Sequence, residues 1–318
     1  MSVPHAGAQA PAAPLAERLA VATQHLLPKQ AITALAGAVA GWQGGAATTA
    51  LIRWFIKRYG VNMAEAALPD PATYKSFNQF FTRALKPGAR PLAQAELLCP
   101  VDGTISQFGR IDGERIVQAF IHAKRHDYSA TALLGGDGAL AAHFHNGHFA
   151  TLYLSPKDYH RIHMPCGGRL LRMIHVPGEL FSVNAATARG VPGLFARNER
   201  VVCVFEGLGE GPDTRPWALV LVGATIVGSM ATVWHGVVNP PRPGTVREWA
   251  YQDQRIELAA GAEMGRFLLG STVVLLFPAG PLAFNPAWQP GGAIRMGDMM
   301  ANQVPSRTAP DQPKPPAA

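Results

Sequence analysis

The pattern of apolar and polar positions divides the chain into a helical N-terminal part and a strand-rich body. Residues 15–59 show helical periodicity, with breaks near Pro28 and at a glycine cluster over residues 41–45. Farther along, short apolar runs alternate with Gly/Pro turns and predict mainly antiparallel strands, among them residues 116–120, 150–154, 200–205, 217–222 and 273–277. We therefore expect an α+β fold, with helices over residues 15–85 and a β-rich domain over residues 86–302.

Shorter features complete this division. Residues 77–81 and 129–134 are predicted to form short helices. Residues 1–14 are mostly Ala, Pro and small polar residues, which cannot bury enough apolar area to fold, so we expect them to be disordered. Residues 303–318 are Pro-rich and polar, and we expect a second disordered tail there.

The N-terminal helices carry the features of a membrane-associating region. Ile52, Phe55, Ile56 and Tyr59 recur at helical spacing, with basic residues on the other side of the helix. Such a stripe is used more often for packing within the protein than for a membrane, and both interpretations stay open here. Residues 30–52 contain no charge, but four glycines and many small residues argue against a transmembrane helix.

Composition narrows the class of partner. The formal net charge is +7, only 15% of the residues are charged, and 48% are hydrophobic. The basic residues are scattered and form no nucleic-acid-binding motif, so we expect an anionic membrane surface and no nucleic acid. The three cysteines have no paired spacing, which predicts neither a zinc site nor a disulfide framework and favours a reducing compartment. No secretory signal peptide is recognisable at the N-terminus.

The main chemical clue is a Gly-Ser-Thr triplet, residues 270–272, that interrupts a buried strand. Apolar residues flank it on both sides over residues 267–277. Read alone, the triplet indicates a bulge made of small residues. The hydroxyl of Ser271 could also fold back onto the carbonyl of Gly270, which would make this peptide bond a reactive one.

A serine becomes a nucleophile when a histidine takes its proton and a carboxylate orients that histidine. His163 and Asp102 are the candidates for these partners, and His160 lies three residues before His163. Asp102 before a glycine is also a typical turn residue, and two histidines three residues apart also suit a metal site or a structural pair. A histidine-rich stretch, with histidines at positions 122, 126, 143, 145 and 148, suggests a metal cluster by composition alone, and we predict no metal there.

Several motifs together resemble the phosphatidylserine decarboxylases of bacterial type. Residues 269–272 (LGST) resemble the family's self-cleavage site, residues 100–103 (PVDG) its aspartate motif and residues 159–165 (YHRIHMP) its histidine motif. Further matching blocks are residues 181–184, 194–200 and 222–229. The resemblance extends from about residue 26 to residue 278 and implies a β-rich catalytic domain that is cut between Gly270 and Ser271.

The resemblance also implies roles for these residues. Asp102, His163 and Ser271 would form the charge relay for self-cleavage, and Ser271 would become a pyruvoyl group, the covalent cofactor, which forms a Schiff base with phosphatidylserine. His160 is the candidate general acid that completes decarboxylation to phosphatidylethanolamine, and we expect that it need not touch Ser271 before cleavage. The two cleaved chains, α and β, would stay together as a heterodimer that could dimerise further. The expected location is peripheral, on the cytoplasmic side of the cell (inner) membrane.

Two other classes of protein fit parts of the sequence. A Ser-His-Asp hydrolase would use the same three residues on an external ester or amide, but no Gly-x-Ser-x-Gly surrounds Ser271. A non-enzymatic module that binds membrane lipids would need only the N-terminal helices, and it would stay a single intact chain.

Overall fold

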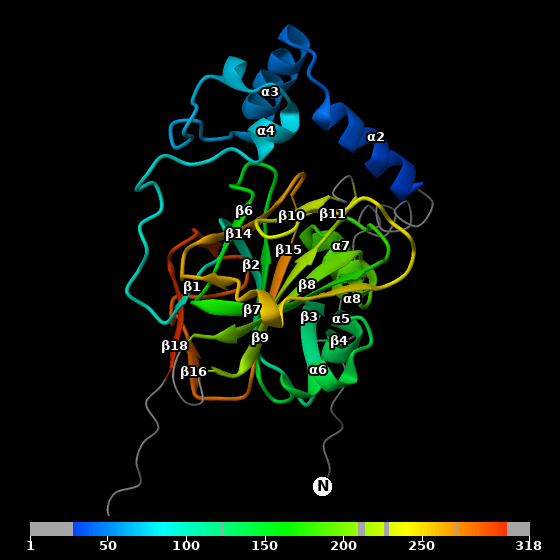
Figure 1. The fold of residues 1–318 in the computed structure, drawn as a ribbon, viewed down its shortest axis with the longest axis vertical. Coiled ribbons are helices and arrows are strands. Elements are labelled where there is room, and N and C mark those ends of the chain that lie inside the picture. Colours follow the sequence, from blue (N-terminus) through cyan, green and yellow to red (C-terminus); the bar gives the residue numbers. More distant parts are fainter. Residues whose placement is uncertain (1–27, 122–123, 209–213, 226–228, 271, 304–318) are drawn as a thin grey trace, which may run out of the picture.

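A computed structural model describes residues 28–121, 124–208, 214–225, 229–270 and 272–303 of the chain. The N-terminal helices form a cap that lies beside one end of a β body (Figure 1). The helical elements are α2 (Lys29–Gly41), α3 (Ala46–Tyr59), η1 (Pro71–Thr73), α4 (Phe77–Phe81), α5 (Ala130–Leu133), α6 (Gly138–Ala142), α7 (Ala185–Gly190), α8 (Leu194–Arg197) and η3 (Gln252–Gln254).

The β body contains mostly antiparallel sheets, which confirms the predicted α+β class. Its strands are β1 (Leu97–Leu98), β2 (Gly103–Arg110), β3 (Arg115–Ile121), β4 (Lys124–Ser129), β5 (His148–Tyr153), β6 (Arg161–His163), β7 (Gly168–Val176), β8 (Arg200–Gly207), β9 (Pro216–Val222), β10 (Met230–Thr232), β11 (Gly236–Asn239), β12 (Arg247–Ala250), β13 (Glu257–Leu258), β14 (Glu263–Phe267), β15 (Thr272–Phe277), β16 (Leu282–Phe284), β17 (Ala293–Ile294) and β18 (Met299–Gln303).

Strand β15 lies near the centre of the largest sheet. Among the described strands, this sheet has the order β12-β7-β8-β9-β15-β5-β2-β17, with β13 added beside β7. All six residues of β15 are buried, because apolar side chains cover both faces of a strand that pairs with β5 and β9. Residues 268–270, which precede it, are half-buried, so the chain enters the core at β15.

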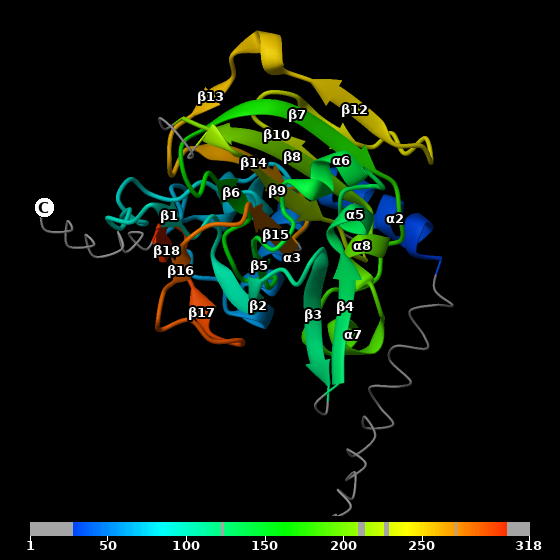
Figure 2. The same cartoon turned by 90° about the horizontal axis from the view of Figure 1, so that it is seen from below.

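A smaller sheet carries the histidine motif. Its described strands run in the order β11-β10-β14-β6, and His163 on β6 is paired with Glu263 on β14. A third sheet has the described order β1-β18-β16, so β18, the last described strand, pairs with β1, the first strand of the body. Strands β3 and β4 form a separate hairpin that projects from the body in Figure 2.

The helical cap has its own small core. Ile52 of α3 is fully buried together with Tyr74 and three phenylalanines of α4. Phe55 and Ile56 pack against the same cluster, so the apolar stripe of α3 is used for packing within the cap. The helix break predicted at residues 41–45 separates α2 from α3. No described helix reaches the length and apolar character that crossing a bilayer would require.

The predicted disordered ends, apart from Gln303 at the end of β18, lie outside the described residues. The three cysteines are described and free.

Candidate active site

The predicted cleavage site lies just before the first residue of β15, next to the cap. Gly270 is described, whereas Ser271 lies outside the described residues. A Cβ atom built on Gly270 would overlap the imidazole ring of His160, and Nε2 is the ring atom nearest to it. The residue before the predicted cut is therefore a glycine because a side chain would displace His160.

His160 is a fully buried, neutral histidine. Its Nδ1 lies 2.8 Å from the carbonyl oxygen of Asp158, and since a carbonyl only accepts, Nδ1 carries the proton. Nε2 has no hydrogen-bond partner among the described residues. Burial, assisted by the positive charge of Arg83, lowers the pKa of His160 to about 3. A bare nitrogen thus lies against Gly270. The expectation that His160 need not touch Ser271 before cleavage stays a prediction, because Ser271 lies outside the described residues.

His163 is also neutral but has both ring nitrogens engaged. Nδ1 donates to the carbonyl of Gly261 at 2.8 Å, and the hydroxyl of Tyr159 donates to Nε2 at 3.0 Å. Burial lowers the pKa of His163. His160 lies just before β6, where its carbonyl accepts a hydrogen bond from the backbone amide of Phe267, whereas His163 ends β6 and pairs with Glu263 of β14. Among the described contacts, His160 and not His163 meets Gly270.

Asp102 is held by Arg90, whose side chain is 6% exposed. Arg90 Nε donates to the Asp102 carboxylate at 2.9 and 3.2 Å, and the amide of Met296 donates to the same carboxylate at 2.9 Å. Arg90 also pairs with Glu65 at 2.8 Å, and Glu65 pairs with Arg295. Asp102 makes no described hydrogen bond to His163. It influences His163 through its charge, which favours the protonated imidazole but is a smaller effect than burial.

Two cavities adjoin these residues. A polar cavity of about 400 Å³ is lined by residues that include Asp102, Arg90, Arg83, Lys157 and Asp158. An apolar groove of about 600 Å³ runs between the cap and the body and ends at His160 and Gly270. Its walls come from α2, α3, α4, the end of β5 and the segments that follow β5, β7, β9 and β14. They include Leu35, Val39, Leu51, Trp54, Phe55, Phe81, Tyr153, Val183, Ala224 and Leu269. The groove suits a long apolar ligand whose polar end reaches His160.

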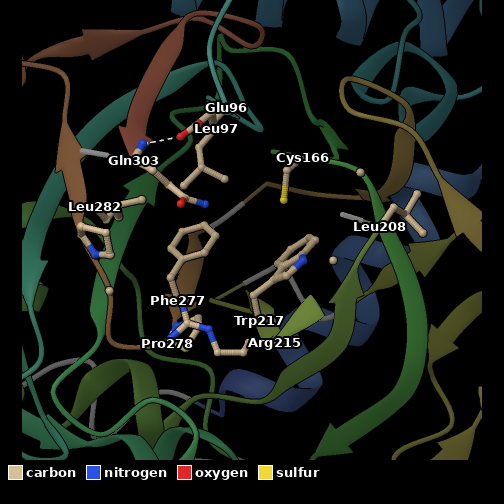
Figure 3. Close-up of a pocket in the computed structure, with 14 residues that line it drawn as sticks. Glu96, Leu97, Cys166, Leu208, Arg215, Trp217, Phe277, Pro278, Leu282 and Gln303 are labelled. Carbon is tan, nitrogen blue, oxygen red and sulfur yellow. Dashed lines mark hydrogen bonds between the residues drawn. The ribbon is translucent and has the colours of Figure 1, made fainter. Parts of the chain in front are cut away.

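A third cavity, of about 340 Å³, lies at the opposite end of β15. Trp217, Phe277, Cys166 and Leu97 face it in Figure 3. It contains none of the predicted site residues.

The histidine-rich stretch provides no metal site in the part of the chain that the structure describes. His122 lies outside the described residues. His148 is buried on β5, and its ring lies 6.2 Å from that of Phe284.

The sequence did not identify several residues that complete the site. Phe81 packs its ring on His160 at a centroid distance of 4.0 Å, and Arg90 holds Asp102. Tyr159 belongs to the histidine motif, but its bond to His163 was not anticipated. The available signal was the run of residues 77–83, FNQFFTR, which carries aromatic residues beside a basic one.

Comparisons with known proteins find similar sequences over most of the chain. A family model described as phosphatidylserine decarboxylase matches residues 77–302, and a second, described as PSD, matches residues 19–60. The chain is 70% identical to the phosphatidylserine decarboxylase proenzyme of Albidiferax ferrireducens, over 91% of this chain and 99% of that protein. It is 69% identical to the corresponding proenzyme of Variovorax paradoxus, over 91% of this chain and 99% of that protein. It is 65% identical to that of Dechloromonas aromatica, over 91% of this chain and 100% of that protein.

Proposed function

The chain belongs to the phosphatidylserine decarboxylase family, and from this premise we propose that it decarboxylates phosphatidylserine with a pyruvoyl group made from its own Ser271. Family membership makes it a carboxy-lyase produced as a proenzyme. It also sets aside the hydrolase and the non-enzymatic lipid-binding module. The observation that supports the site best is the bare Nε2 of His160 against Gly270 at the end of an apolar groove.

The surroundings of Gly270 fit such a cofactor. Gly270 is half-buried, and the fully buried His160 beside it supplies a polar atom without a partner among the described residues. A pyruvoyl group supplies a ketone that captures the amine of the serine headgroup and accepts the electron pair released as carbon dioxide leaves. The groove residues would hold the substrate's apolar chains and exclude water from the headgroup.

Self-cleavage requires a base for the Ser271 hydroxyl. In the proposal, the Ser271 oxygen bonds to the Gly270 carbonyl carbon, the amide C–N bond breaks, and its nitrogen takes up a proton, which gives an ester. Elimination then removes the Cα proton of the serine, breaks the bond between this oxygen and Cβ, and releases the Gly270 carboxylate, which leaves a Cα–Cβ double bond. Cβ next takes up a proton, so that the double bond moves to Cα and the nitrogen. Water finally replaces the nitrogen, which leaves as ammonia.

His163 is the proposed base for this step. Its Nδ1–H is fixed by Gly261, so Nε2 is the accepting nitrogen, and the charge of Asp102 favours the imidazolium that forms. Nε2 must leave the Tyr159 hydroxyl to reach Ser271. A specific observation favours a second assignment, because His160 already has a bare Nε2 beside Gly270.

His160 is proposed to return the proton to the substrate carbon after carbon dioxide leaves. Its low pKa keeps it neutral in the resting chain. An anionic substrate in the groove raises the pKa of a neighbouring imidazole, because negative charge favours the protonated form. Substrate binding would therefore load His160 with the proton that it later donates.

We also propose that the cap docks on the cytoplasmic face of the inner membrane. Trp42 and Trp54 are each 57% exposed, and Leu35 and Val39 of α2 are exposed as well. Basic side chains of α3, at positions 53, 57 and 58, are exposed beside them and suit anionic lipid. The groove opens among these residues, so a lipid could enter it without leaving the bilayer.

After the cut, the two chains would remain one heterodimer. Strand β15 belongs to the smaller chain and lies between β5 and β9 of the larger one. Separating the chains would expose six buried residues.

The proposal is tested by carbon dioxide release from phosphatidylserine labelled in the serine carboxyl group. The native chain should release labelled carbon dioxide, and Ser271→Ala should release none. Release by Ser271→Ala at the native rate would remove the proposed cofactor.

A further inference from the structure

A short segment of the cap, residues 81–83, packs on and hydrogen-bonds to the histidine motif and the residues just before it. The Phe81 ring lies 4.0 Å from the ring of His160. The side chain of Arg161 donates from Nε to the carbonyl of Thr82 at 2.9 Å. Arg83 Nη2 donates to the carbonyl of Lys157 at 3.1 Å, with a longer contact of 3.4 Å to the carbonyl of Asp158. Three consecutive residues of the cap thus contact residues 157–161 of the body.

The Asp158 carbonyl is shared by Arg83 and His160. It accepts the Nδ1–H of His160, and this bond leaves Nε2 without a proton toward Gly270. We propose that Arg83 is a positioning residue that fixes the orientation and tautomer of His160 through the Lys157 and Asp158 carbonyls. The proposal rests on the proposed function, because the position of His160 matters only if Gly270 is the cleavage site.

The cost of burying Arg83 supports a functional role. Arg83 is 4% exposed, and its Nε and Nη1 have no partner among the described residues. Burial lowers the pKa of the guanidinium, which means that the charged form is disfavoured where it lies. A buried charge with unpartnered donors destabilises a fold, and such arrangements concentrate at functional sites.

The charge of Arg83 also acts on His160. Phe81 and Gly270, which pack on the imidazole, carry no charge, and the Asp158 group that meets Nδ1 is a backbone carbonyl. Arg83 is the charged side chain that opposes protonation of His160. Removing the charge should therefore make His160 easier to protonate, whereas Lys at this position should preserve the effect but lose the planar fork.

The direct test measures the His160 ring itself. In the full Ser271→Ala chain, which needs no processing, ¹⁵N NMR of labelled histidines reports the tautomer and the protonation midpoint. We expect the Nδ1–H tautomer in the parent and a higher midpoint in Arg83→Met. Arg83→Lys should keep the midpoint but mix the tautomers. Arg115→Met, an exposed arginine paired with Asp112 outside the site, is the matched control.

Two results would overturn the proposal. The first is an Arg83→Met chain whose tautomer and midpoint equal those of Arg115→Met. If Arg83→Met does not fold, the second is an Arg83→Lys chain in which His160 keeps the tautomer of the parent. Both outcomes are independent of activity, so they remain distinct from a failure of the native chain to release carbon dioxide, which would instead refute the proposed function.

Kinetics separate positioning from substrate binding. In the chain with native Ser271, Arg83→Met should lower kcat about tenfold or more and leave KM within about twofold, because the groove is unchanged. A raised KM with native kcat would make Arg83 a substrate-binding group and would contradict the positioning role.

Discussion

Replacing Gly270 by alanine should test the packing at the cleavage site. The added methyl would overlap the His160 ring, which cannot move freely because Phe81 lies on it and Asp158 holds Nδ1. Overpacking a buried site costs about 1–3 kcal/mol. Gly270→Ala leaves the chemistry of the carbonyl unchanged, and the cut itself does not need His160 in this account, so slower cleavage would report displacement of the peptide that the fixed His160 ring pushes aside.

The assay has two parts. Processing is followed on denaturing gels over time. The free energy of unfolding is measured in the Ser271→Ala background, where the parent and the Gly270→Ala variant both stay uncut. Gly138→Ala is the control, since a Cβ at this helical position meets nothing within 4 Å. We expect Gly270→Ala to process at least about tenfold more slowly, since 1.4 kcal/mol in a barrier is tenfold in rate. Native processing together with native stability would refute the packing argument.

Three further predictions follow from the site and the cap. His163→Ala should stay uncut, whereas His160→Ala should cut but release carbon dioxide on the order of a hundredfold more slowly, and an uncut His160→Ala beside a processed His163→Ala would exchange the roles. Because the pKa of His160 falls to about 3 in the fold, the unfolded chain binds more protons than the native chain below pH 6.5. This difference should lower the free energy of unfolding by about 2 kcal/mol between pH 6.5 and 5, measured by denaturant unfolding. His160→Gln in the Ser271→Ala background should lose this contribution to the pH dependence. Replacing Trp42 and Trp54 by alanine should weaken binding to anionic liposomes in a sedimentation assay. Binding equal to that of the native chain would mean that another part of the protein contacts the membrane.

Local patterns predicted the elements of the fold well. The apolar run before residue 278 became β15, the glycine cluster separated α2 from α3, and the short helix over residues 77–81 has the predicted bounds. These features depend on periodicity and turn residues close in sequence. The direction of the α3 stripe could not be predicted, because its packing partner, α4, follows after a long connection.

The contacts of the site were less predictable, because they join distant residues. His163 bonds to Gly261, 98 positions away, and Met296 bonds to Asp102 across 194 positions. A motif identifies the histidine but not the carbonyl that fixes its tautomer. Spacing alone likewise gave no sign that Phe81 would cover His160.

The intact mass spectrum of the purified chain tests the central claim most directly, since it reports the cut and the new terminal group together. We expect two chains, residues 1–270 and 271–318, with the smaller one lighter by one ammonia than a chain that begins with serine and blocked to Edman degradation. An intact chain of 318 residues, or a small chain with a free N-terminal serine, would contradict the account.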